Sequence, residues 1–136
     1  MKTIVYLLIM IKMKWNKLYE YPASMRTSIE GRRHYEITGK KLPSVTTILS
    51  ATQSAEKMES ILKWQKRVGE VEAERVKNQA ASRGTNMHLH LERYILGTGH
   101  KDLTDEGQVA GDMAQVIIDK GLCDMSEIWG SEVTLY

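Results

Sequence analysis

The sequence is poor in residues that cross-link or interrupt a chain. It has one cysteine, Cys123, which excludes an intramolecular disulfide framework and a zinc site built from cysteines. It has no phenylalanine and two prolines, so its eight methionines and its leucines must supply much of the packing, as is common in helical cores. Because Cys123 follows an expected helix end in an apolar setting, we expect it in the core and not as a nucleophile.

The chain also has little excess of charge of either sign. The chain has 19 basic and 17 acidic residues among its 136, a formal net charge of +2. This balance does not require a nucleic-acid partner, so any basic surface must come from local clustering. With 42% hydrophobic and 26% charged residues, the composition excludes a disordered or fibrous protein and fits one ordinary domain.

No hydrophobic run is long enough for a membrane span. Residues 3–11 are apolar but reach only about half of the required length, and no small-residue cleavage site follows closely. We interpret residues 1–14 as a leader, either an edge strand or an extension from an upstream start codon, in preference to a signal peptide. Residues 15–136 would then form the domain, with no membrane partner and a cytoplasmic location.

The first half of the domain has signals for strands. Residues 26–38 predict a β-hairpin with its turn at 30–32, and residues 38–41 predict a second turn. The run at 43–49 begins with a proline and is rich in β-branched residues. It fits either a strand or a short helical turn, and periodicity does not distinguish them.

Helical patterns follow. A helix is expected from the cap Ser54 to Gly69, and a second one over residues 70–82 with a narrow stripe of small side chains. Residues 83–85, around Gly84, predict a break or a tight junction into a third helix over 85–96.

The last part predicts one more helix and a strand. The helix begins after the cap Thr104 and stops at Gly121, and Ser126 to Tyr136 predicts a strand with Trp129, Val133 and Leu135 on one face. Because this strand has no partner after it, we infer the N-terminal part of a longer α+β protein, truncated within its sheet. The apolar stripe of the helix is expected to be buried and comprises Val109, Ala110, Met113, Val116 and Ile117.

The densest set of chemically useful residues lies in the third expected helix. His88 and Glu92 are i, i+4 neighbours, so an imidazole and a carboxylate lie on one side. Such a pair can share one divalent cation, or Glu92 can orient His88. The same spacing also arises by chance on ordinary helices, where the pair forms a hydrogen bond at the solvent boundary. His90 is expected to point towards Arg93 and to be exposed, as is His34.

Three motifs in this order resemble the RecB-like branch of the PD-(D/E)XK nucleases, and most closely phage exonucleases and the mitochondrial genome maintenance exonuclease. They are Leu-Pro-Ser-Val-Thr-Thr-Ile-Leu-Ser at 42–50, Lys-Trp with Arg-Val-Gly within 63–69, and a segment from Ala80 through Arg-Gly-Thr to His88 and Glu92. The resemblance covers about residues 26–136.

The resemblance implies a metal-dependent deoxyribonuclease that uses Mg²⁺ or Mn²⁺ and degrades DNA from single-stranded ends. It assigns His88 to the metal site, places Glu92 beside it, and matches Glu132 to the acidic position of the strand before the catalytic hairpin. The family's later Gly-x-x-Asp and Asp/Glu-x-Lys motifs are absent from this sequence. We therefore expect this chain alone to bind metal weakly and to cleave little or no DNA.

Independently of the resemblance, a set of basic residues suggests a DNA-binding surface. Trp64 can stack on a base, although core packing is the favoured interpretation. The basic residues also fit an ordinary solvated face, and the rival hypotheses are a non-catalytic helical nucleic-acid-binding module and a structural protein. The oligomeric state is not indicated. The candidate phosphate contacts are Lys63, Lys66, Arg67, Lys77 and Arg83, with hydroxyl donors Ser44, Thr46 and Thr47.

Overall fold

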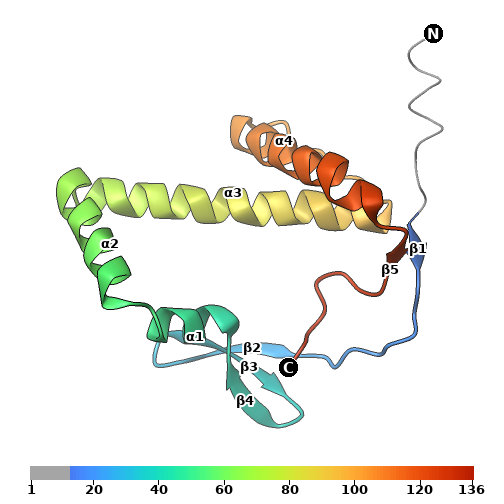
Figure 1. Ribbon diagram of the computed structural model, residues 1–136, viewed down its shortest axis with the longest axis horizontal. Coiled ribbons are helices and arrows are strands. Elements are labelled where there is room, and N and C mark those ends of the chain that lie inside the picture. Colours follow the sequence, from blue (N-terminus) through green and yellow to red (C-terminus); the bar gives the residue numbers. More distant parts are fainter. Residues whose placement is uncertain (1–12) are drawn as a thin grey trace. The chain divides into compact units, whose positions relative to one another are not determined.

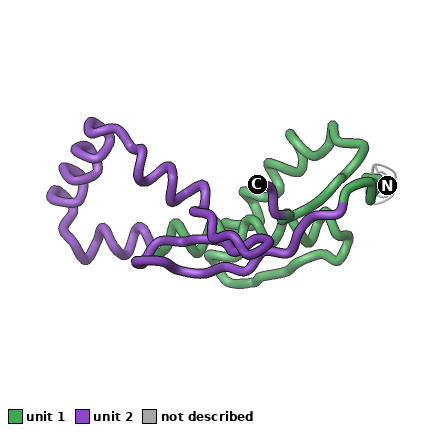
Figure 2. Tube along the Cα trace, turned by 90° about the horizontal axis from the view of Figure 1, so that it is seen from below, with its two compact units in different colours: residues 1–19, 78–133 green, residues 20–77, 134–136 purple. Residues whose placement is uncertain are grey.

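The computed structural model describes residues 13–136 and has an α+β fold (Figure 1). The expected fold class is confirmed, whereas most of the predicted leader lies outside the described residues. The chain divides into two compact units (Figure 2). Unit 1 contains the described residues up to Tyr19 and residues 78–133, and unit 2 contains residues 20–77 and 134–136.

Unit 2 contains a three-stranded antiparallel sheet in the order β2-β3-β4. Strands β2 (Met25–Ile29) and β3 (Arg32–Ile37) form the predicted hairpin. Its two-residue turn has positive φ at both Glu30 (51°) and Gly31 (73°), which matches the twist of the flanking strands.

The second predicted turn is shorter than expected. Thr38 and Gly39 make it alone, with φ values of 49° and 78°, and Lys40 already pairs with Ile37. Lys40 and Lys41 therefore belong to strand β4 (Lys40–Pro43) and not to the turn.

The β-branched run after β4 is a helix, α1 (Val45–Ala51). Ser44 is buried, with 7% of its surface exposed, and its hydroxyl accepts a hydrogen bond from the Thr47 amide at 3.1 Å. The Thr47 hydroxyl in turn donates to the carbonyl of Arg33 at 2.8 Å. The cap at Ser44 and this tie to β3 favour the helix over a fourth strand.

Helix α2 (Ala55–Val68) begins at its predicted cap, Ser54, and ends at Gly69, which has a φ of 89°. Helix α3 (Glu70–Leu96) then continues for 27 residues. The break predicted at residues 83–85 is wrong. A Cβ at Gly84 would meet nothing within 4 Å, so no neighbouring backbone approaches there, and one glycine among good helix formers does not end a helix.

Helix α4 (Asp105–Lys120) is capped by Thr104, whose hydroxyl accepts from the Gly107 amide at 3.0 Å. Its buried residues are Gly107, Ala110 and Ala114. The predicted buried stripe is therefore wrong except for Ala110, because the buried face of α4 carries small residues and the larger side chains of the stripe are exposed. The exposed members of that stripe are Val109, Met113, Val116 and Ile117.

The predicted strand at 126–136 is mostly irregular. Only β5 (Glu127–Ile128) is extended, and it pairs in parallel with β1 (Lys14–Trp15). The Trp129 ring lies 5.3 Å from that of Tyr19. Glu132 has a φ of 53°, which is incompatible with an extended strand, so Val133 and Leu135 do not share a strand face with Trp129.

Small side chains dominate the buried apolar set of the described residues. Cys123, in the 3₁₀ turn Leu122–Asp124, is exposed, so its predicted place in the core is wrong. The buried apolar residues are Ile37 and Ala73 in unit 2, and Ala110, Ala114 and Ile128 in unit 1.

Candidate functional site

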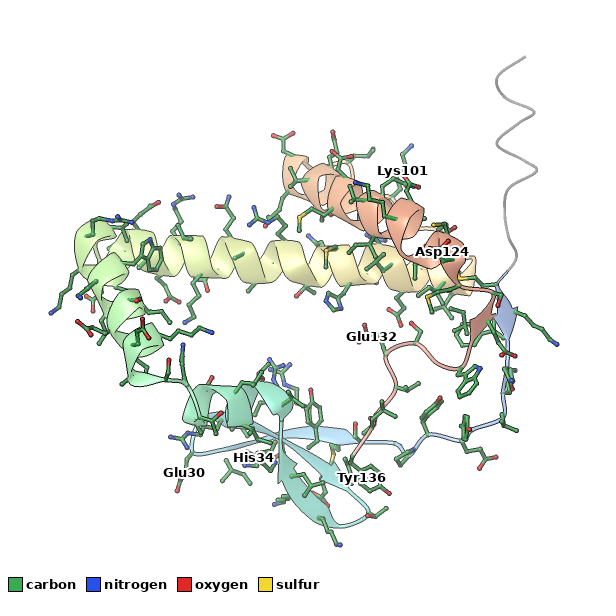
Figure 3. All side chains as sticks on the ribbon, viewed as in Figure 1. Glu30, His34, Lys101, Asp124, Glu132 and Tyr136 are labelled. Atoms are coloured by element: carbon green, nitrogen blue, oxygen red, sulfur yellow. The ribbon has the colours of Figure 1, made fainter. Side chains whose placement is uncertain are left out.

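Two of the predicted active-site residues lie together in unit 1. His88 is on α3, and Glu132 is on the irregular segment after β5 (Figure 3). The His88 Nδ1 atom lies 3.4 Å from a Glu132 carboxylate oxygen, and the side chains are 66% and 59% exposed. The imidazole is therefore accessible to solvent and ions. Resemblance alone pointed to Glu132, and the structure places it near His88 through a loop and not through the predicted strand.

The backbone at Glu132 is unusual. A positive φ in a residue other than glycine is uncommon, and such conformations concentrate at turns and functional sites. Glu30 and Thr38 share this feature, and both lie in tight hairpin turns. Glu132 instead lies in the irregular segment after β5, and its carboxylate is the group that approaches His88.

Glu92 does not complete a three-residue site. It lies one turn after His88 on α3 and is half-buried. Across the described residues 13–136, no three His, Cys, Asp or Glu side chains are grouped so that they can hold a metal ion. His88 and Glu132 thus offer one nitrogen and one carboxylate, and the predicted role of Glu92 beside the metal stays a prediction.

His90 differs from its prediction as an exposed side chain pointing towards Arg93. It is half-buried, its ring lies 4.5 Å from that of His100 in an edge-on arrangement, and a Cβ on Gly111 would come within 3.3 Å of it. Hydrogen bonds from Thr104 keep the pKa of the neighbouring Asp102 below its usual range, and the two histidines add a smaller effect in the same direction. Gly111 within α4 was the sequence signal for the contact of this helix with the His90 ring.

The predicted phosphate-binding residues are divided between the two units. Arg83 belongs to unit 1, whereas the other four basic residues belong to unit 2. Lys63 pairs with Glu59 at 2.7 Å and Lys77 with Glu74 at 3.4 Å, and all four side chains are largely exposed. Exposed pairs of this kind are weak, so both lysines remain available to an anion. The remaining members, Lys66 and Arg67, lie in the last turn of α2.

A groove of about 750 Å³ lies where α2 meets the start of α3. Trp64, which is half-buried, lines it together with Lys66 and Lys77. Lys63 and Arg67 do not line it. Glu70 and Glu74 line the groove as well, so it carries two ammonium groups and two carboxylates beside an indole on which a base can stack.

Two of the predicted hydroxyl donors are engaged in folding. Ser44 caps α1 and also contacts the Thr46 and Thr47 hydroxyls at 2.9 Å. Thr47 donates its proton to the Arg33 carbonyl. Their direct role as phosphate donors stays a prediction, and their observed role is to fix α1 against β3.

Comparison with known proteins adds no family assignment. No family model, curated protein or solved structure matches the chain. None of the helices in residues 13–136 combines the length and the apolar character needed to cross a membrane.

Proposed function

We propose that this chain contributes to the metal site of a DNA exonuclease that hydrolyses phosphodiester bonds with Mg²⁺ or Mn²⁺, acting on single-stranded ends in the cytoplasm of a phage-infected cell. The observation that supports this best is the approach of His88 to Glu132, 44 residues apart in sequence. Both residues were matched to the nuclease site by the same family resemblance.

The pair suits a hard divalent cation in part. Neighbouring ligands of an octahedral ion at about 2.1 Å are separated by roughly 3 Å. The 3.4 Å between the His88 nitrogen and the Glu132 oxygen is close to this spacing. A bound ion would polarise a phosphoryl oxygen and acidify a water molecule. With two protein ligands, most of the coordination sphere would be left to water and phosphate, so weak binding is expected.

Manganese binding to the chain tests this proposal. Mn²⁺ accepts an imidazole nitrogen more readily than Mg²⁺ does, and it is detected directly by electron paramagnetic resonance. We expect wild type to bind Mn²⁺, and His88→Ala and Glu132→Gln each to weaken binding about tenfold or more. His34→Ala is the matched control, because His34 lies on β3 in unit 2. Unchanged Mn²⁺ binding in His88→Ala would contradict the proposal.

A non-catalytic nucleic-acid-binding module is the second candidate function. The groove with Trp64, Lys66 and Lys77 favours it, because that groove needs no metal to bind a single strand. Under this alternative, DNA binding falls steeply with salt, persists in EDTA and is unaffected by His88→Ala. DNA binding that is lost in EDTA or in His88→Ala would contradict it.

A further inference from the structure

A second, smaller pocket in unit 2 is lined by cations and hydroxyls. Its volume is about 590 Å³, and it lies between the β2–β3 turn, α1 and one residue of α3. No aspartate or glutamate is among its lining residues. They are Gly31, Arg32, Arg33, Thr46, Thr47, Ser50, Ala51 and Lys77.

Arginine supplies most of its charge. Arg32 and Arg33 are both exposed, and within the described part of the chain neither forms a salt bridge. Glu30 lines an adjoining pocket, which shares Arg32, Thr47 and Ala51 with this one. Lys77 adds a third cation, which Glu74 neutralises only in part at 3.4 Å and high exposure.

The local fold presets the shape of this pocket. Arg32 and Arg33 are the first two residues of β3, directly after the β2–β3 turn, and both line the pocket. The Thr47 hydroxyl holds the Arg33 carbonyl at 2.8 Å, and the Ser44 amide donates to the same oxygen at 3.0 Å. The arginine backbone is thereby fixed against α1 before any ligand arrives.

We propose that this pocket binds a phosphate group of a nucleic-acid strand. The arginine guanidinium offers two parallel N–H donors that match a phosphate, and hydroxyls complete such sites. The choice of a nucleic acid rests on the proposed function, whereas anion binding itself does not. Arg32 and Arg33 are not among the phosphate contacts expected from the sequence. The phosphate is either a terminal monoester or an internal diester, and the assay below separates the two.

Fluorescence anisotropy in EDTA tests the proposal without cleavage. The probes are internally labelled single-stranded oligothymidines of about 12 nucleotides, with a 5′-phosphate, a 3′-phosphate or hydroxyls at both ends. We expect the double variant Arg32→Gln/Arg33→Gln to weaken binding at least tenfold and to reduce its salt dependence. Arg26→Gln, on the neighbouring strand and outside the pocket, is the matched control and should bind as wild type does.

The comparison of the three probes identifies which phosphate is bound. Tighter binding of one end-phosphorylated probe that the double variant abolishes indicates a terminal phosphate, and an equal loss on all probes indicates an internal one. Binding by the double variant that equals Arg26→Gln overturns the proposal. If wild type binds no oligonucleotide, the nucleic-acid ligand is excluded, and titration with inorganic phosphate then decides whether an anion site exists at all. His88→Ala should bind the oligonucleotides as wild type does in EDTA. A failure of the proposed metal site therefore does not alter the result of this assay.

Discussion

Two glycine-to-alanine substitutions test how the helices of this protein pack. Gly84 lies inside α3, and a Cβ there would meet nothing within 4 Å. Gly107 lies in the first turns of α4, and a Cβ there would overlap the side chain of Asp102. Both positions are helical, so the intrinsic preference for alanine is similar and the surroundings decide the difference.

The magnitudes follow from these surroundings. Alanine is favoured over glycine within a helix by about 1 kcal/mol, so Gly84→Ala should stabilise the fold by up to that amount. Asp102 is held by hydrogen bonds from the Thr104 amide at 3.0 Å and hydroxyl at 2.7 Å, so it cannot move aside freely. Overpacking of this kind costs about 1–3 kcal/mol, so Gly107→Ala should destabilise despite its better helix propensity.

Equilibrium denaturation followed by circular dichroism at a helix-sensitive wavelength gives both values. We expect the two variants to shift the midpoint in opposite directions with similar slopes. Destabilisation by Gly84→Ala would mean that a backbone approaches α3 there, as the predicted tight junction required. Stabilisation by Gly107→Ala would mean that the Asp102 loop does not pack on α4.

Three further predictions concern caps, pH and the orientation of α4. Ser44→Ala should cost about 1 kcal/mol or more, because it removes the cap of α1 and the contact with Thr47; chemical denaturation measures it, and a neutral result would contradict the capping geometry. Because the pKa of Asp102 is lowered in the fold, its contribution to stability is present above the usual aspartate pKa and is lost as pH falls through the lowered value. Asp102→Asn should remove this loss of stability from an acid titration followed by circular dichroism. Ala114→Leu should destabilise the fold by about 1–3 kcal/mol, while Val116→Ser should change its stability by no more than about 0.5 kcal/mol. A larger loss for Val116→Ser in thermal unfolding would support the buried stripe that was expected from the sequence.

The elements predicted correctly are those that local chemistry decides. Ser54 and Thr104 cap their helices because a hydroxyl reaches an amide three residues on, and this needs no other part of the chain. The turn at Glu30 and Gly31 is equally local. Each of these signals is contained within a few residues, so a single sequence reveals it.

Two of the errors involve contacts distant in sequence. The rotation of α4 depends on which face meets α3, and a helix with apolar residues on one side and small residues on another fits either way. The final strand was predicted from its alternation, but within the described chain it finds only the two residues of β1 as a partner.

The candidate site, too, could be predicted only in part from the sequence. Spacing on one helix identified His88, and resemblance identified Glu132, but neither indicated that a loop would join them. Arg32 and Arg33 were missed because their pocket exists only once α1 folds back over the hairpin turn.

The alanines that fill the interior of unit 1 affect how the protein responds to heat and denaturant. Among the described residues of this unit, the buried apolar ones are Ala110, Ala114 and Ile128, so unfolding this part transfers little hydrocarbon to water. Its heat-capacity increment and its denaturant slope should both be small for its length. The melting curve should therefore be broad.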